Sequence, residues 1–382
     1  MKKIFFVALA ATLLAAGCQK TEIINRLGDA MTFSTEMGKL TKADGTPLAS
    51  NGGEANLKAQ DFRVWAYYVA EDANTGARAG AAYDGMVNSP VTYTKASDSW
   101  DTDKQYYWPG KDKELKFFAV SADAATYGTG EESKIAPSDD RTKLDITGFT
   151  VSNTEPNTDL MVADFVTQSQ NTKPDDKSVS LNFRHALTKV EFWFKTGGTA
   201  EKPQETKVWV QNITVTGINT VADLNVDDSH NFTWSNRTTP LPFSDKYVTG
   251  DTDEALPTDL VKIEGQVDDN SAMQLTHTAK TFATWLVIPQ DVKKAAAEGV
   301  TAVDLQVEVL YVMGNRQFKA SFPLGKEGDL DEWKENQYVK YNVTLTPNLI
   351  SFVPSVSPWT PTGEDAALGT EDDAHKDMND GN

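Results

Sequence analysis

The sequence has 382 residues, 39% of them hydrophobic, so it is long enough for about two domains with substantial cores. The formal net charge is −19, which argues against nucleic acid as a partner and against adhesion to an anionic bilayer through basic patches. Cys18 is the only cysteine, so the chain cannot form an internal disulfide or a cysteine-based metal site.

The first residues have the pattern of a bacterial lipoprotein signal peptide. Two lysines precede the apolar stretch 4–14, which is too short to span a bilayer. Small residues then lead to Cys18, as in a lipobox, although Ala15 stands where Leu is usual. The sequence predicts removal of residues 1–17, acylation of Cys18 and anchoring of the exported chain through its lipid. The alternative is an ordinary secreted protein with a stray cysteine in its signal.

Alternation of apolar and polar residues recurs along the exported chain and predicts an all-β protein. In chain order, the predicted strands are 62–69, 115–120, 179–183, 188–195, 208–216, 282–288, 301–311, 317–322 and 338–346. A short helix is predicted at 290–298. Many short strands joined by turn-rich segments are typical of antiparallel β-sandwiches.

The segment 167–177, which contains Pro174, is predicted to join two domains. The final segment is acidic and has few apolar residues, so we expect it to be disordered. The predicted organisation is a signal peptide (1–17), a tether (18–29), an N-terminal β-sandwich domain (30–175), a C-terminal β-sandwich domain (176–360) and the tail (361–382).

No set of residues in the sequence is typical of a catalytic or metal site. The four histidines lack metal-ligand spacing, and we find neither a G-x-S-x-G motif nor a phosphate-binding loop. We therefore expect no enzymatic activity, no catalytic residues, no metal and no cofactor. The many carboxylates leave a two-carboxylate surface hydrolase open as an alternative. His185 lies between two predicted strands and is expected to form a local hydrogen bond.

The nine tryptophans suggest an alternative from another functional class, a surface lipoprotein that binds glycans through exposed aromatic rings. Tryptophans within predicted strands are expected in the core. These are Trp65, Trp193, Trp209 and Trp285. Tryptophans nearer turns are the candidates for exposed platforms. These are Trp100, Trp108 and Trp333.

Several short segments follow one another from about residue 30 to about residue 360. They are MTFST at 31–35, TKA at 41–43, YYWP at 106–109, LKFFA at 115–119, DLMVA at 159–163, LNFRHALTKV at 181–190, and the closing segments 333–343 and 350–352 with Trp359. In this order and spacing, behind a lipobox, they resemble the fimbrillin family of Bacteroidetes, the Mfa-like major fimbrial subunits.

The resemblance implies two tandem transthyretin-like, Greek-key β-sandwich domains and export to the outer membrane as a lipoprotein. It also implies that a trypsin-like surface protease removes the lipidated N-terminus, after which subunits polymerise by strand exchange; other members stay lipidated as anchors or cap the tip. The implied partners are other fimbrial subunits, in a homo- or hetero-polymer, the outer-membrane lipid around acylated Cys18, and a host or bacterial surface ligand. The implied location is the cell surface, in or on a fimbrium.

Strand exchange requires one strand that leaves its sheet and another that replaces it. The first predicted strand, 30–35, is short and offers Met31 and Phe33 on one face, which makes it the predicted displaceable strand. The last segment, 348–359, is longer, and its predicted donor face carries three large apolar residues. These are Ile350, Phe352 and Val356. The alternative is that both strands simply complete their own domains.

The implied protease prefers arginine, and its candidate sites lie on both sides of the first strand. A cut after Arg26 removes the lipid but keeps the strand, whereas a cut after Lys39 or Lys42 removes both. No arginine lies between the first strand and Arg63. This departure, together with the acidic tail, favours an uncleaved anchor or tip member.

Overall fold

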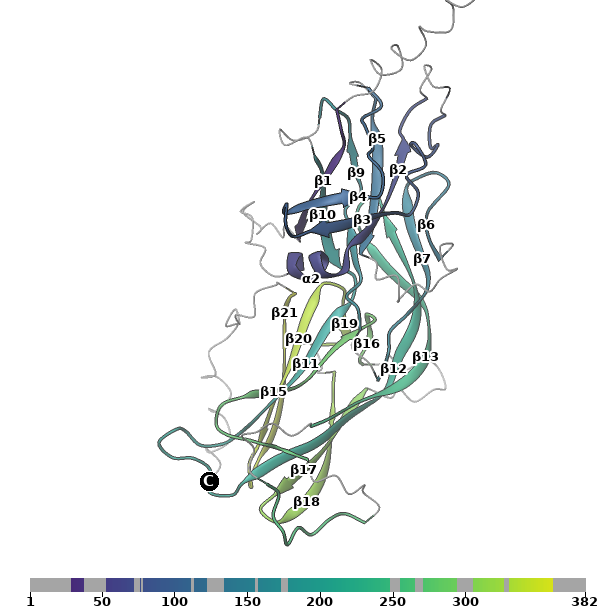
Figure 1. Cartoon of the computed structure of the whole chain (residues 1–382). Coiled ribbons are helices and arrows are strands. Elements are labelled where there is room, and N and C mark those ends of the chain that lie inside the picture. The colour runs from purple at the N-terminus through teal and green to yellow at the C-terminus, as the bar shows by residue number, and fades with distance from the viewer. Residues whose placement is uncertain are drawn as a thin grey trace, which may run out of the picture.

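A computed structural model of the chain describes residues 29–37, 53–71, 76, 78–110, 113–121, 134–154, 157–172, 178–247, 255–264, 271–293, 305–325 and 330–359. These residues are built from strands and one short helix, α2 (Gly53–Gln60), which confirms the predicted all-β class. The strands form two bodies arranged end to end along an elongated molecule (Figure 1).

The first body is a closed, barrel-like sheet. Its strands follow one another around the barrel in the order β2 (Phe62–Tyr68), β3 (Ser89–Thr94), β4 (Ser99–Thr102), β1 (Thr32–Met37), β10 (Ser178–His185), β8 (Met161–Ala163) and β5 (Leu115–Ser121). The barrel closes because β5 pairs along its whole length with β2. The short strand β9 (Val166–Gln168) adds to β5 outside this ring.

Aromatic side chains fill much of the barrel, because strand alternation turns every second residue inward. The ring of Phe62 lies 5.3 Å from that of Phe183 and 4.9 Å from that of Trp100. Phe117, on the neighbouring strand β5, is fully buried as well. The barrel therefore has a core of its own.

The second body consists of two sheets that share one hydrophobic core. The smaller sheet has the order β15 (Lys280–Val287), β11 (Thr188–Thr196), β20 (Gln337–Leu345) and β21 (Ile350–Pro358). The larger has the order β18 (Arg316–Pro323), β17 (Gln306–Met313), β12 (Val208–Asp227), β7 (Lys143–Thr150) and β6 (Ile135–Pro137), and β13 (Phe232–Lys246) and β14 (Met273–Gln274) also pair with β12.

The long strand β12 connects the parts of the larger sheet. It has 20 residues, more than twice the predicted 208–216, and it pairs with β17 through its first half and with β7 through its second. A shift in register after Val215 lets it bend. Gly217 lies at this bulge with a φ of 89°, a backbone conformation that favours glycine.

Strands from each side of the predicted domain junction pair with strands from the other side. β10 lies after residue 175, yet it pairs with β1 and β8 of the barrel. β6 and β7 lie before residue 175, yet β7 pairs with β12 of the second body. The two bodies are therefore interlocked by the chain rather than joined by one linker.

Two details of the sequence prediction are wrong. The sheets are not purely antiparallel, because β1 runs parallel to β10 and β11 runs parallel to β20; each pair joins strands far apart in the chain, which long crossover connections allow. Residues 290–298 do not begin a helix, because Gln290–Asp291 form strand β16, paired with β19 (Glu332–Trp333). Gln290 is buried, and its Oε1 accepts a hydrogen bond from the Asn219 N–H at 2.9 Å, a tertiary contact that outweighs helix propensity.

Candidate strand-exchange site

The first strand is paired almost entirely with one neighbour. All six residues of β1, Thr32–Met37, pair in parallel with residues 178–183 of β10. On its other side, only Phe33 pairs with β4, opposite Trp100. Removal of β1 would therefore leave the side of β10 unpaired and open the barrel between β10 and β4.

The inward face of β1 consists of apolar residues and one threonine. Met31, Phe33 and Met37 are 3%, 6% and 3% exposed. Sequence reasoning missed Met37 because it ended the strand at Thr35. The hydroxyl oxygen of Thr35 accepts a hydrogen bond from the Nε1–H of Trp100 at 3.0 Å. The site that β1 occupies is therefore apolar at three positions and polar at one.

Aromatic rings of the barrel surround Phe33 of β1. Phe33 meets Phe62 and Phe117 edge to face, with ring centroids 6.1 and 6.4 Å apart. Such contacts add about 0.5–1.5 kcal/mol each beyond the burial of area. A replacement strand would need a large apolar residue at the position of Phe33 to recover them.

The last described strand, β21, lies at the edge of the four-stranded sheet. It pairs through all of its residues with β20, and no other described strand pairs with it. Ile350, Phe352 and Val356 pack against the core but are only partly buried. Val353, on the opposite face, is 49% exposed. The structure thus places the predicted displaceable and donor strands in different bodies, each docked within its own chain.

Phe352 is the best anchored of the three predicted donor residues. Its ring stacks on Phe322 at 5.2 Å, with 5° between the ring planes, and on Tyr341 at 5.1 Å, with 21° between them. Pro354 and Pro358 have no N–H, so β21 donates fewer backbone hydrogen bonds than its length suggests. The attachment of β21 to its own sheet therefore depends strongly on side chains.

A charged cluster holds β20, the strand on which β21 docks, against β11. Glu191 Oε1 accepts a hydrogen bond from Lys189 Nζ at 2.8 Å, and Oε2 accepts hydrogen bonds from Trp193 Nε1 at 2.7 Å and from the Tyr338 hydroxyl at 2.6 Å. Burial alone would raise the pKa of Glu191, but these hydrogen bonds outweigh it and lower the pKa.

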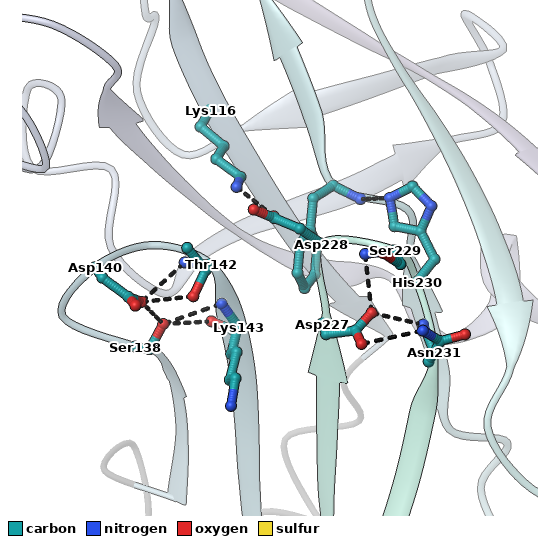
Figure 2. Close-up of polar contacts among 11 residues, drawn as sticks. Lys116, Ser138, Asp140, Thr142, Lys143, Asp227, Asp228, Ser229, His230 and Asn231 are labelled. Carbon is teal, nitrogen blue, oxygen red and sulfur yellow. Dashed lines mark hydrogen bonds and ion pairs between the residues drawn. The ribbon is translucent and has the colours of Figure 1, made fainter.

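The tip of the β12–β13 hairpin connects the two bodies (Figure 2). Asp228 forms an ion pair with Lys116 of β5. His230 Nε2 accepts a hydrogen bond from the Phe165 N–H at 3.1 Å, and its carbonyl oxygen accepts one from Arg184 of β10 at 2.6 Å. The tip therefore contacts several elements of the barrel at once.

Carboxylates in this region order turns. Asp227 accepts hydrogen bonds from the backbone N–H groups of Asn231 and Ser229, and these lower its pKa. The hydroxyl groups of Ser138 and Thr142 bind Asp140 in the adjacent turn and lower its pKa to about 2 (Figure 2). Within the described residues, no group of three or more histidine or carboxylate side chains is placed to hold a metal ion.

The prediction of exposed tryptophan platforms is wrong. Trp100, Trp108 and Trp333 are 7%, 0% and 1% exposed, because neighbouring strands cover them. Trp65, Trp209 and Trp285 lie in the core as predicted, whereas Trp193 is only half-buried, with Lys340 Nζ 3.9 Å from its ring centroid. Eight of the nine tryptophans are buried, so they offer no exposed platform for a glycan.

Some predicted site residues lie outside the described residues. They are the lipidation site, the candidate cleavage sites and the acidic tail: Cys18, Arg26, Lys39, Lys42 and 361–382. Among the helices that are described, none is long and apolar enough to cross a membrane. His185, by contrast, forms the expected local hydrogen bond, between its Nδ1 and Asp159 Oδ2 at 2.7 Å.

The described residues thus form a barrel interlocked with a two-sheet body, with β1 paired mainly to β10 and β21 at the edge of its sheet. A model of the fimbrillin-like family matches residues 46–359, and the chain belongs to this family. This confirms the resemblance seen in the sequence. The family is one of fimbrial proteins.

Two relatives illustrate the similarity. The chain is 27% identical over 187 residues to fimbrium subunit Fim1C of Phocaeicola vulgatus; the match covers 47% of this chain and 48% of that protein, so it spans about half of each. The crystal structure of a fimbrial protein from Bacteroides vulgatus is similar with a TM-score of 0.54 at 19% identity, covering 86% of this chain and 99% of that one. The second comparison supports the fold alone.

Proposed function

We propose that the chain is a structural subunit, or an accessory anchor or tip subunit, of a cell-surface fimbrium. In this proposal it reaches the outer membrane lipidated at Cys18, and proteolysis near Arg26, Lys39 or Lys42 triggers assembly by strand exchange. Its two bodies correspond to the tandem β-sandwich domains of the family. Its partners are other fimbrial subunits, the outer-membrane lipid and a host or bacterial surface ligand.

The observation that carries the proposal is the match between the inward faces of β1 and β21. The inward face of β1, together with Met31 just before the strand, reads Met31, Phe33, Thr35, Met37. The face of β21 reads Ile350, Phe352, Pro354, Val356. Both have large apolar residues at the first, second and fourth positions, with phenylalanine second. Because alternate side chains of an added strand fill the groove of its host, β21 has the pattern needed to replace β1.

This match defines a register for the exchanged strand. If β21 of one subunit lies parallel to β10 of the next, Phe352 takes the place of Phe33 between Phe62 and Phe117. Pro354 then takes the place of Thr35 and leaves the Nε1–H of Trp100 without its acceptor. The proposed register therefore recovers the aromatic contacts and loses one hydrogen bond.

The position of the last paired residue supports a cleavage site after β1. The strand ends at Met37, so a cut after Lys39 or Lys42 separates the whole of β1 from the rest of the chain. A cut after Arg26 leaves β1 in place. Cleavage after Lys39 or Lys42 suits a subunit that polymerises. Cleavage after Arg26 suits a subunit that only loses its lipid.

The test is limited trypsin treatment of the exported chain carrying Cys18→Ser, with N-terminal sequencing and SDS gels of unboiled samples. A polymerising subunit gives a cut after β1 and a ladder of SDS-resistant oligomers. The inward variant Phe352→Asp should abolish the ladder, and the matched outward variant Val353→Asp should keep it. Deletion of residues 348–382 should also abolish it. If the cut chain yields only monomers, the polymerising role is excluded and an anchor or tip role is favoured.

A further inference from the structure

The residue that follows β21 is held more firmly than the strand itself. Trp359 is 9% exposed, whereas the apolar residues of β21 are only partly buried. Its indole stacks on the imidazole of His185, with ring centroids 3.7 Å apart and 11° between the planes. The backbone N–H of Trp359 donates a hydrogen bond to the Asn336 carbonyl oxygen at 2.9 Å. The end of β21 thus reaches the base of the barrel, where β10 ends (Figure 1).

His185 is fixed in place by a buried carboxylate. Its Nδ1 lies 2.7 Å from Asp159 Oδ2, and both side chains are 3% exposed. The other polar atom of each group, His185 Nε2 and Asp159 Oδ1, has no hydrogen-bond partner among the described atoms. A buried polar atom without a partner is unfavourable, so water that entered when Trp359 moved away would stabilise both groups. The stacked state and the open state are therefore closer in free energy than burial of Trp359 alone suggests.

β10 connects this stack directly to β1. His185 is the last residue of β10, and residues 178–183 of the same strand form the whole parallel ladder with β1. His185 also pairs with Met161 of β8, just after Asp159. Loss of β1 removes the only neighbour on one side of β10 and leaves β8 as its partner on the other. Any shift of β10 moves His185 relative to Trp359.

We propose that Trp359, His185 and Asp159 form a latch through which β1 controls the release of β21. While β1 is in place, β10 holds His185 beneath Trp359, and β21 stays on its own sheet. When β1 leaves, the latch opens and β21 is freed. The use of this latch rests on the proposed strand exchange, but its existence does not, because the contacts lie within one chain.

The latch is tested by hydrogen–deuterium exchange of the full exported chain carrying Cys18→Ser, read in peptides that cover β20 and β21. Trp359→Ala should accelerate exchange of the β20–β21 ladder by about tenfold or more and leave β12 and β17 unchanged. Trp359→Phe keeps a ring on His185 and should accelerate it by less than about threefold. If Trp359→Ala folds normally and leaves β21 as protected as before, the latch is excluded.

The control by β1 is tested with Phe33→Ala. In the parent chain this variant should accelerate exchange of β21 by about tenfold, but in the Trp359→Ala background it should add nothing, because the latch is already open. Val91→Ala is the control: it weakens the barrel at β3, away from β10, and should leave β21 unchanged. The coupling between β1 and the latch is overturned if Phe33→Ala accelerates exchange of β21 equally in both backgrounds. It is also overturned if Phe33→Ala and Val91→Ala accelerate exchange of β21 equally. A latch without an oligomer ladder would refute the exchange proposal alone, and a ladder without a latch would refute this one alone.

Discussion

The attachment of β21 to its own sheet can be measured at one residue. Phe352 is partly buried and stacks on Phe322 and Tyr341. Full burial of a phenylalanine contributes roughly 1.5–3 kcal/mol, of which about half applies here. The two ring contacts add about 0.5–1.5 kcal/mol each. We therefore expect Phe352→Ala to lower the free energy of unfolding by about 2–4 kcal/mol.

The matched control is Val353→Ala, one residue away on the outward face. Val353 is 49% exposed, so its truncation should change the free energy of unfolding by less than about 0.5 kcal/mol. The measurement is equilibrium unfolding in urea, followed by tryptophan fluorescence, with Cys18→Ser in all chains. The slope with urea should be the same for all three chains, so that the midpoints report stability alone. If the two variants differ by less than about 0.5 kcal/mol, the side chains of β21 do not hold it to its sheet.

Two further predictions concern polar contacts. Thr35→Val removes the acceptor of the Trp100 Nε1–H and should lower the free energy of unfolding by about 1–3 kcal/mol. The control Thr32→Val, at an exposed position of the same strand, should have little effect. Equal urea midpoints for the two variants would contradict this prediction. The pKa of Glu191 in the folded chain lies below its usual 4.5, so the ionised group adds stability that is complete above pH 4.5 and is lost as the pH falls through the folded-state pKa. Glu191→Gln should therefore flatten the decline of stability below pH 4.5, measured by urea unfolding at successive pH values, and parallel curves for the two chains would show that the cluster contributes nothing.

The sequence predicted strands well where side chains alternate. The predicted 188–195, 317–322 and 338–346 correspond closely to β11, β18 and β20, because in each the alternation is regular and turn residues mark the ends. β13 was missed, since Pro240 and Pro242 lie within it and proline argues against a strand. It forms because it lies along one side of β12 with no described strand beyond it, where a missing N–H is tolerated.

Strand pairing could not be predicted from local pattern. Nothing in residues 32–37 indicates that their partner lies about 150 residues further on in β10, since alternation specifies a buried face but not the neighbour that covers it. Proximity to a turn suggested that Trp108 and Trp333 are exposed, but the fold buries both. Trp108 packs edge to face on Phe117, and the Nε1–H of Trp333 donates a hydrogen bond to the Tyr341 hydroxyl. Trp359 was read only as part of a family motif, and its contact with His185 requires the fold.

Burial in the two bodies suggests why a strand would move from one to the other. On its own sheet, β21 has partners on one side only, and its apolar residues are partly exposed. In the barrel, the residues of β1 at the matching positions are 3–6% exposed, and Phe33 contacts two aromatic rings. Moving Ile350, Phe352 and Val356 from partial to full burial contributes roughly 2–4 kcal/mol in total. Each side chain is taken to gain about half of the free energy of its full burial. Loss of the hydrogen bond from the Trp100 Nε1–H to Thr35 offsets this gain by about 1–3 kcal/mol. The proposed exchange is thus favourable by a small margin in side-chain burial, and the backbone ladder along β10 replaces the ladder with β20 that β21 gives up. A Pro354→Thr variant, which restores the acceptor, should make the oligomers more resistant to heating in SDS; no change would place β21 in a different register.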